Sequence, residues 1–359
     1  MSEASVRPLR RRRRIDSTAL VYLALLGVII VSAILVATVG RSFFSAGNIR
    51  DILTGMSVLG FVAIGQTLVI LCGSLDLSVP YVVSLSSLIA ADTMKGSAAN
   101  IAPAVLAALA VAAVIGLVNG LIVTKLHVNG FIATLGMGLI IKGYLDTNYK
   151  GTSGDVPWEF QLIGATGVGP IPVSTILMIV VALLAALFLS RTRTGNHMFA
   201  VGGNEQVARL SGIRTAQPII VAHVLCSVTA AFAGLLLASR LGVGSPTVGI
   251  QGGYDLLSIA AVVLGGTILA GGRGSVWGTI GGVAIFAVLD NVMSVLQVNP
   301  FMKDVVRGVV IVAAVAVYTA RQVERRRARF GADGGADTDP DVDPSPSDRV
   351  SESVKGGSV

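Results

Sequence analysis

The chain has 359 residues, of which 53% are hydrophobic and only 13% are charged. A soluble domain carries roughly 25% charged residues, so this composition excludes an ordinary soluble globular protein and indicates a membrane protein. The formal net charge of +7 does not indicate nucleic-acid binding, because the Lys and Arg residues lie at the ends of apolar runs. A helical protein with basic flanks on one side of the membrane is therefore expected.

The chain opens with a basic segment, residues 1–16, followed by an apolar stretch over residues 17–40. This stretch exceeds the roughly 7 to 15 apolar residues of a secretory signal, and no clear cleavage site follows it. It therefore predicts a retained signal-anchor helix.

The apolar stretches along the rest of the chain predict further membrane spans. A helix needs about 20 mainly apolar residues to cross the hydrocarbon layer, and it must satisfy its own backbone hydrogen bonds there. Five stretches have that length without any Asp, Glu, Lys or Arg, and five more are shorter or hold an ionisable residue. The ten predicted spans cover residues 17–40, 52–75, 78–94, 96–124, 128–148, 160–190, 215–239, 254–271, 276–296 and 303–320. The expected fold class is thus an all-α polytopic integral membrane protein, with nine or eleven spans as alternatives to ten.

The distribution of basic residues predicts the orientation of these spans. With ten spans, one side carries 19 of the 27 Lys and Arg residues and the other carries eight. Because cytoplasmic flanks retain basic residues during insertion, both termini and the loop 191–217 are expected in the cytoplasm, and residues 149–172 outside. The transmembrane domain is then expected over residues 17–322.

Residues 323–359 form the expected cytoplasmic C-terminus. From about residue 331 they lose apolar periodicity and become rich in Asp, Gly, Ser and Pro. A segment of this composition buries too little apolar surface to order itself, so it predicts a disordered acidic tail.

Residues that could carry catalysis or bind a metal do not cluster. Cys72 and Cys226 lie in or beside apolar segments and form no CxxC or Cys/His cluster, so they predict small core residues. The histidines His127, His197 and His223 are scattered and show no nucleophile–base or metal-ligand spacing. A membrane-embedded enzyme is therefore disfavoured, and no metal site is predicted.

The first motif is Gly73–Pro80, where Asp76 and Pro80 interrupt a run that is otherwise apolar from Ile52 to Ala91. Proline disfavours helix at the residue before it, and Asp and Ser side chains bond freed backbone groups, so the helix should break here. Such a break either lines a cavity or pathway or is a plain turn between two spans.

The second motif is Gly202–Ile213 in the loop 191–217. Asn204 can cap the N-terminus of a short helix, Glu205 suits the positive end of its dipole, Arg209 the opposite end, and Gly212 can take the left-handed conformation that ends it. The segment predicts either a compact knob that another protein could grip or an ordinary connecting loop with a capped turn.

The third motif is the glycine-rich run Gly252–Thr267 with its continuation Gly271–Thr279, which predicts close backbone approach and a sharp turn around Arg273. It is not a phosphate-binding loop, because such a loop needs a Gly-Lys dipeptide and the chain contains none. No nucleotide site is therefore predicted in this chain.

Together, the three motifs resemble, in order, the permease subunits of bacterial ATP-binding-cassette (ABC) importers of the ribose, xylose and galactose type. The resemblance spans roughly residues 50–320, and it departs from the family pattern at Pro80, where glycine is usual, and at Asp255, where glutamate is common. It implies a multi-pass protein of the bacterial inner membrane that carries a simple sugar.

The resemblance also implies partners and a role for the second motif. A separate ATPase subunit would bind ATP and magnesium, and an extracytoplasmic sugar-binding protein would deliver the solute. A second permease, a copy or a paralogue, would complete the pathway within membrane lipid, and no cofactor is expected on this chain. The residues implied to form the ATPase-coupling helix are Gly202, Gly203, Asn204, Glu205, Ala208, Arg209, Ser211 and Gly212.

Polar residues within the apolar segments are the candidates for lining the pathway, because a charge at the bilayer centre costs about 2.5 to 3.5 kcal/mol on insertion scales. These candidates are Gln66, Asp76, Asn119, Asn129, Thr134, Asp290 and Asn291. Hydrogen bonding between helices is the alternative role for each of them. Lys142 and Asp146, four residues apart, are expected to pair with each other.

An ion-coupled secondary transporter of a small polar solute is the competing class. It would need an intramembrane ion site and two comparable halves. Val128–Phe131 and Val298–Phe301 echo each other, but the surrounding residues keep no constant offset. The importer permease is therefore the preferred interpretation.

Overall fold

The computed structural model describes residues 17–310 and residue 312. The chain divides into two units, Met1–Ile311 and Val312–Val359, and every helix and strand named here lies in the first. The predicted basic segment 1–16, the end of the predicted span 303–320 and the predicted acidic tail lie outside the described residues.

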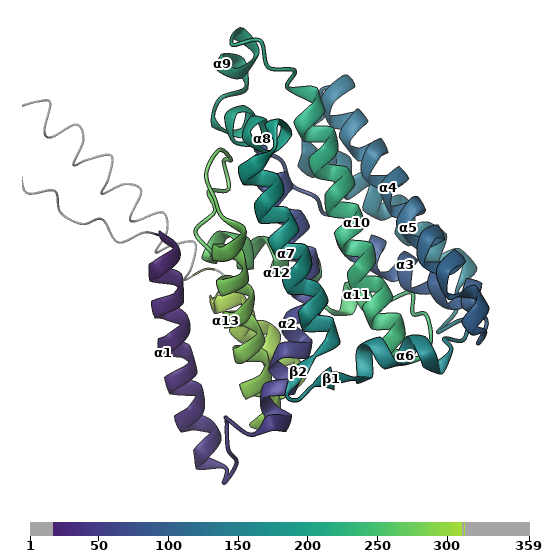
Figure 1. Ribbon diagram of the computed structural model, residues 1–359, viewed down its shortest axis with the longest axis vertical. Helices are drawn as coiled ribbons and strands as arrows, with labels where there is room; N and C mark the ends of the chain where they lie inside the picture. Colours follow the sequence, from purple (N-terminus) through teal and green to yellow (C-terminus); the bar gives the residue numbers. More distant parts are fainter. Residues whose placement is uncertain (1–16, 311, 313–359) are drawn as a thin grey trace, which may run out of the picture. The chain divides into compact units, whose positions relative to one another are not determined.

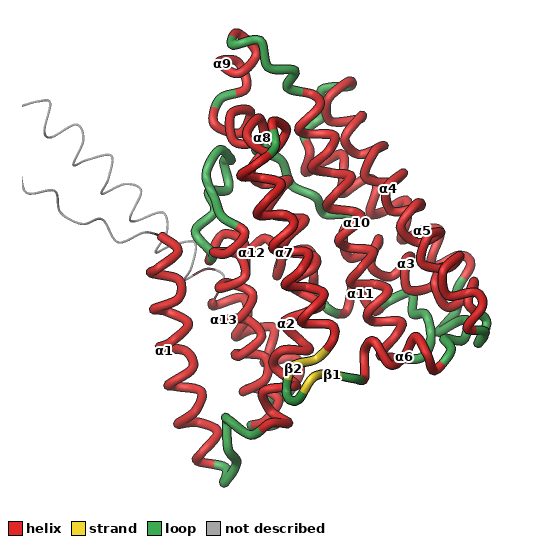
Figure 2. Tube along the Cα trace, in the orientation of Figure 1, coloured by secondary structure: helices red, strands yellow, loops and turns green. Residues whose placement is uncertain are grey.

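The described chain is almost entirely helical (Figures 1 and 2). The long helices are α1 (Ser17–Thr38), α2 (Ala46–Leu71), α3 (Val79–Met94), α4 (Ile101–Lys125), α5 (Gly130–Asn148), α7 (Val173–Arg191), α10 (Ala216–Leu241) and α13 (Val276–Val295). The shorter elements are η1 (Ala98–Asn100), α6 (Trp158–Ala165), β1 (Gly167–Val168), β2 (Ile171–Pro172), α8 (Arg193–Gly203), α9 (Glu205–Leu210), α11 (Val248–Gln251) and α12 (Tyr254–Leu264), and residues 300–310 are helical again.

Six helical stretches are long and apolar enough to cross a membrane. They are Thr18–Thr38, Ala46–Leu71, Ala98–Lys125, Val173–Arg191, Ala216–Leu241 and Val276–Val295. Helices α3 and α12 are apolar but shorter, and α5 carries Lys142 and Asp146, which form an ion pair as expected. The all-helical polytopic class is confirmed, and the total of ten spans stays a prediction.

Two apolar stretches predicted as single spans are not continuous helices. Residues 160–190 comprise α6, an antiparallel β1–β2 hairpin and then α7, because Gly169 adopts a positive φ of 61° and prolines stand at positions 170 and 172. Residues 254–271 are helical only to Leu264, and Gly266 and Gly271 then adopt positive φ angles. Glycine takes this backbone region readily, so it ends a helix that hydrophobicity alone would extend.

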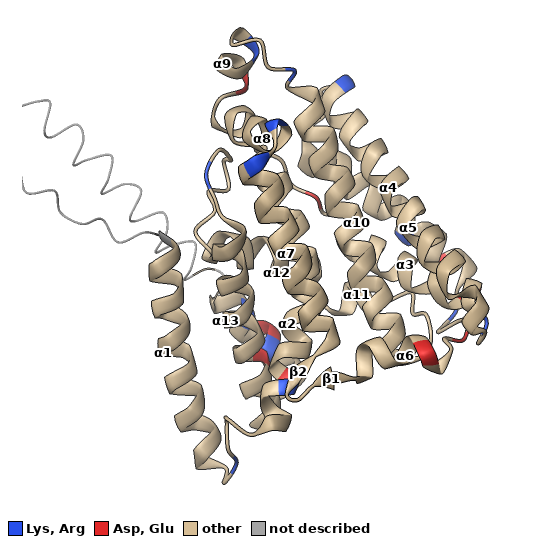
Figure 3. Cartoon of the chain, viewed as in Figure 1, with Lys and Arg blue, Asp and Glu red and all other residues tan. Residues whose placement is uncertain are grey.

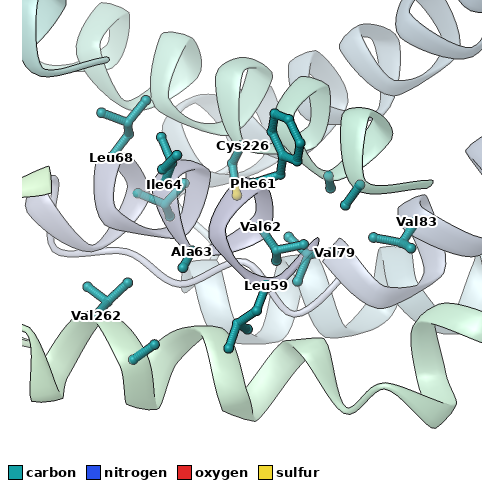
Figure 4. Packing of buried hydrophobic residues seen from close by; sticks show 14 of the residues in the cluster. Leu59, Phe61, Val62, Ala63, Ile64, Leu68, Val79, Val83, Cys226 and Val262 are labelled. Atoms are coloured by element: carbon teal, nitrogen blue, oxygen red, sulfur yellow. The ribbon is translucent and has the colours of Figure 1, made fainter. Parts of the chain in front are cut away.

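Helix α2 forms the centre of the bundle, with 83% of its most apolar window buried, whereas α1 is 17% buried. Figure 4 shows its side chains, among them Leu59, Val62 and Leu68, packed towards α3, α10 and α12. Both cysteines are free and buried in this core, as expected.

Small residues let the helices approach closely, as the glycine content predicts. A Cβ on Gly65 of α2 would lie 2.7 Å from the Cα of Cys226, and a Cβ on Gly120 of α4 would lie 2.7 Å from the Cα of Ile220. Helices without a hydrophobic driving force between them gain van der Waals contact in this way, so α2 and α4 both pack directly against the α10 backbone.

The connections gather at two opposite ends of α10. At its first end, Cys72 Sγ lies 3.8 Å from the carbonyl oxygen of Pro218. At its second end, the Ser153 amide donates to the Gly244 carbonyl at 3.0 Å and the Ser239 hydroxyl donates to the Phe160 carbonyl at 2.7 Å. The segment 149–172 therefore lies at the opposite end of α10 from the end of α2.

Candidate functional site

The first motif forms a connector, residues 72–78, between α2 and α3, in which residues 76–78 are buried. Helix α2 ends at Leu71 and α3 begins at Val79 with a proline in its first turn, so the predicted break is present. Asp76 is fully buried, and its Oδ1 accepts hydrogen bonds from the Ser78 amide at 2.9 Å and the Ser78 hydroxyl at 2.5 Å. The connector is thus a turn between two helices, and the Asp76 side chain within it is buried and hydrogen-bonded.

Four surrounding helices hold the connector through polar side chains. The Asn119 amide of α4 donates to Ser78 Oγ at 3.0 Å, and the Leu77 amide donates to Thr134 Oγ1 of α5 at 3.0 Å. In the amide orientation that satisfies both atoms, Gln66 of α2 donates to the Asp76 carbonyl at 3.2 Å and accepts from its amide at 3.3 Å. We call Gln66, Asp76, Ser78, Asn119, Thr134 and His223 together the Asp76 network.

His223 of α10 completes the Asp76 network. Its Nδ1 lies 3.4 Å from Asp76 Oδ2 and its Nε2 lies 3.2 Å from Ser74 Oγ, and its side chain is fully buried. The three histidines are scattered along the sequence, so this contact of His223 was not predicted. A helical register places His223 one turn from Cys226 on a buried face, but nothing local shows which partner that face meets.

The pathway candidates therefore lie in three places. Gln66, Asp76, Asn119 and Thr134 belong to the Asp76 network. Asn129 is exposed and caps α5, where its Oδ1 accepts from the Phe131 amide at 2.9 Å. Asp290 and Asn291 line a cavity at the other end of α2.

The second motif forms a short helix, α9, whose capping agrees with the sequence. Asn204 Oδ1 accepts from the Val207 amide at 3.0 Å, and Glu205 pairs with Arg209 at 2.9 Å. At the C-terminus the Gly212 amide bonds the Arg209 carbonyl and the Ile213 amide bonds the Ala208 carbonyl, both at 3.0 Å. This pair of bonds is a Schellman motif, and it ends α9 with Gly212 at a φ of 82°.

Gly202 and Gly203, in contrast, do not belong to this short helix. They end the preceding helix α8, where Gly202 packs on the backbone of the other two motifs. A Cβ on Gly202 would lie 1.9 Å from the Leu71 carbonyl oxygen and 2.6 Å from the Gly272 amide nitrogen, whereas a Cβ on Gly203 would meet nothing within 4 Å.

The three motifs meet at this point, which we call the glycine junction: Gly73, Gly202, Gly271 and Gly272. The Gly272 amide donates to the Leu71 carbonyl at 3.0 Å, and Gly271 and Gly272 have φ angles of 91° and 73°. No side chain separates these backbones, so the end of α2, the end of α8 and the loop after α12 lie in direct contact.

A cavity of about 590 Å³ is present at the opposite end of α2 from the glycine junction. Its lining includes Asp51 of α2, Tyr254 of α12, and Asp290 and Asn291 of α13. Figure 3 shows basic and acidic residues mainly near the helix ends, with a mixed group beside α2 and α13. Asp290 forms a two-oxygen pair with Arg307, both N–O distances being 2.8 Å.

Within the described residues, no group of three or more His, Cys, Asp or Glu side chains could hold a metal ion. Most polar groups of the Asp76 network bond one another and the backbone and so organise the helices, although Asn119 Oδ1 has no partner among the described residues. A bundle of apolar helices of this kind, with the backbone hydrogen bonds satisfied within each helix, defines an α-helical membrane protein.

Residues 48–315 match the family model for the permease component of the branched-chain amino acid transport system, so the chain belongs to this family. It is 40% identical to the ribose import permease protein RbsC of Escherichia coli K12 over 304 residues, 83% of this chain and 94% of the relative. It is 34% identical to the galactose/methyl galactoside import permease protein MglC of Haemophilus influenzae, covering 85% of this chain and 94% of the relative.

The ribose import permease protein of Bacillus subtilis is 37% identical over 294 residues, 81% of this chain and 90% of the relative. No solved structure matches the chain. The chain is a multi-pass protein of the bacterial inner membrane and the permease subunit of an ABC importer, a transport component and not an enzyme. The prediction of an importer permease rather than a secondary transporter is confirmed.

Proposed function

We propose that this chain forms the translocation pathway for a simple sugar. The observation that carries the proposal is the 40% identity to a ribose import permease over 94% of that relative's length. The relatives named for galactose and methyl galactoside match over a similar share, so the proposal concerns the class of small sugars and not one member.

The sugar would cross with energy from a separate ATPase subunit that binds ATP and magnesium, and we assign α9 as its docking helix. Leu210 is 89% exposed and Val207 is 57% exposed, although Ala208 on the same helix is buried. Apolar side chains on an otherwise polar, well-capped helix favour a protein partner over water. The Glu205–Arg209 pair, together with a 3.1 Å hydrogen bond from Thr215 to Glu205, orders the helix before docking.

The glycine junction supplies a route from the docking helix to the pathway. A displacement of α8 and α9 would press directly on the end of α2 through Gly202, because their backbones already touch. It would also press on the loop after α12 through Gly272. Packed backbones have few intermediate arrangements, so such a contact favours movement between discrete states.

The topology we propose has ten spans with both termini in the cytoplasm. The six long apolar helices are joined by α3, α5, α12 and the helix that begins at residue 300. The loop 191–217 would then be cytoplasmic, and the segment 149–172, at the opposite end of α10, would face outward. A sugar-binding protein would dock on that outer side, and a second permease, a copy or a paralogue, would complete the pathway.

Purification in mild detergent, followed by uptake measurements, tests this function. The chain should copurify with an ATP-binding subunit, and proteoliposomes of the complex with its binding protein should accumulate D-ribose or D-galactose only when ATP is supplied. A solitary chain that accumulates solute with an ion gradient as its energy source, and without ATP, would contradict the proposal. The same preparation with ATP replaced by a non-hydrolysable analogue is the control.

A further inference from the structure

The cavity beside α13 has the size and position of a solute-binding site. Its volume of about 590 Å³ lies within the roughly 300–1,000 Å³ typical of small-molecule pockets. It is lined from Arg41, Asp51 and Arg240 at the helix ends to Phe286 within α13, so it lies away from the glycine junction. In the proposed topology this is the outer side, from which an imported solute arrives.

The charges in the cavity largely neutralise one another. Arg307 binds both oxygens of Asp290 and also pairs with Asp304 at 3.0 Å, so its guanidinium is held in place. Asp51 and Arg240 hold no side-chain hydrogen bond within the described residues, and both line the same space. The lining thus offers hydrogen-bond donors and acceptors whose positive and negative charges nearly balance. Such a lining suits a neutral polar ligand better than an ion.

Asn291 points to the kind of ligand. Its Oδ1 is buried and has no hydrogen-bond partner among the described residues, and the residue lines the cavity. A buried acceptor without a partner costs free energy, and a ligand hydroxyl would supply the missing donor. The empty acceptor therefore favours a ligand that carries hydroxyl groups.

The aromatic lining completes the match to a sugar ring. Tyr254 and Phe286 both face the cavity, and a Cβ on Gly252 would lie 2.4 to 2.8 Å from the Tyr254 ring. The absence of a side chain at Gly252 thus leaves room for the tyrosine ring. Aromatic faces pack against the apolar C–H surface of a ring, while amides, carboxylates and guanidinium groups bond its hydroxyls.

We propose that this cavity binds the transported solute on its way across the membrane, as a neutral polyhydroxylated ring. Asn291, Asp51 and Tyr254 contact the solute, and the Asp290–Arg307 ion pair fixes the position of the cavity lining. The inference deepens the proposed function and rests on it. The mild excess of arginines over aspartates makes an anionic sugar the competing ligand, and the experiment separates the two.

The first test is Asn291→Val in the reconstituted complex. The change removes an acceptor that is unpaired in the ligand-free protein, so folding is expected to remain intact. Uptake of D-ribose at low concentration is expected to fall about tenfold, the factor that corresponds to one lost hydrogen bond. Asn148→Val, at an exposed asparagine outside the cavity, is the matched control and should transport normally.

The second test does not depend on transport. Ser294, in the cavity lining, is changed to cysteine, and its reaction with a membrane-impermeant thiol reagent is timed in vesicles that expose the outer side. Both native cysteines are buried, which keeps the background low. D-ribose is expected to slow the reaction severalfold, and D-ribose 5-phosphate at equal concentration is expected to have no effect.

The outcomes separate the two proposals. Protection by the phosphate alone would overturn a neutral ligand, and no protection by either, with Asn291→Val transporting normally, would overturn the cavity as a site while sugar import stands. Wild-type complex that accumulates no sugar with ATP would overturn the proposed function itself.

Discussion

The connector 72–78 and the exposed helix α9 are both short segments between longer helices, and they place polar and apolar groups in opposite ways. In the connector, the carboxylate of Asp76 and the ring of His223 are fully buried. In α9, the side chain of Leu210 is 89% exposed. A buried carboxylate persists only when its oxygens are hydrogen-bonded, and Asp76 meets this condition through Ser78 at Oδ1 and His223 at Oδ2.

The two segments find their stabilising partners in different places. The connector finds them within the chain, from α2, α4, α5 and α10, so it belongs to the folded core. Helix α9 orders itself by caps and one ion pair but leaves its apolar residues without a cover. The first segment should therefore control stability, and the second should control association. The glycine junction, which joins them, should affect both.

The largest effect is expected at Asp76. Asp76→Ala leaves the Ser78 amide and hydroxyl without their acceptor in a buried place, so the free energy of unfolding should fall by roughly 3–5 kcal/mol. Denaturation of the purified protein in mixed micelles measures it. Asp76→Asn keeps one oxygen acceptor and should lose only about 1–2 kcal/mol. Equal losses for the two variants would show that the carboxylate's bonds to Ser78 do not stabilise the connector.

A second effect is expected at the glycine junction. Gly202→Ala forces a Cβ into the Leu71 carbonyl, so α8 must shift from α2, at a cost of about 1–3 kcal/mol. ATP hydrolysis should continue with less sugar carried per ATP, as measured by paired uptake and hydrolysis assays. Gly203→Ala is the matched control, because a Cβ there meets open space, and it should transport normally. Uncoupling by both variants alike would assign the effect to α8 itself and not to the junction.

A third effect concerns binding alone. Leu210→Ser should leave the free energy of unfolding within about 0.5 kcal/mol of wild type, because the side chain is exposed. The dissociation constant for the ATPase subunit should rise roughly tenfold, as expected for one apolar interface anchor. Val168→Ser alters a comparably exposed residue, 71% accessible, in the β1–β2 hairpin at the opposite end of the helices. If this control weakened ATPase binding as much, α9 would not be the docking helix.

The smallest effect is expected at Tyr149, in a partly exposed polar cluster. Its burial is intermediate between that of Asp76 in the connector and that of Leu210 in α9. The Tyr149 hydroxyl donates to Asp92 at 2.9 Å, and burial followed by this hydrogen bond raises the pKa of Tyr149 to about 12. An unfolded tyrosine has a pKa near 10, so the folded protein retains a proton that the unfolded chain loses between about pH 10 and 12. The stability that Tyr149 contributes is therefore complete below pH 10 and lost as the pH rises through 12.

Tyr149→Phe should cost about 1 kcal/mol at neutral pH, since it deletes one partly exposed hydrogen bond. It should also flatten the decline in unfolding free energy above pH 10, which a series of denaturation curves would show. An unchanged slope in the variant would mean that other groups cause the decline.

The local features of the connector and of α9 were predictable from sequence. Proline and the Asp-x-Ser pattern break a helix through short-range sterics and hydrogen bonds, so the break after Leu71 required no knowledge of the neighbours. Asn204 and Gly212 act within one helical turn, and both caps are present. The Lys142–Asp146 pair, four residues apart, is local in the same sense.

The errors arose where glycine or long-range packing decided the structure. Hydrophobicity favoured single helices over 160–190 and 254–271, but Gly169 and Gly266 adopt backbone angles that end them. Gly203 was grouped with Gly202 by motif, although a Cβ on Gly203 would meet open space and a Cβ on Gly202 would meet the Leu71 carbonyl. His223 has no partner near it in sequence, because Asp76 lies 147 residues away.

The class of helical membrane permease could therefore be predicted from the sequence, because apolar length, basic flanks and ordered motifs are all properties of consecutive residues. Helix packing set where the polar candidates lie: four of the seven gather around the Asp76 connector, while Asp290 and Asn291 line a cavity. The reason is physical. A polar side chain between packed helices bonds whatever donor or acceptor lies across the interface, and that neighbour is set by helix packing and not by its place in the chain.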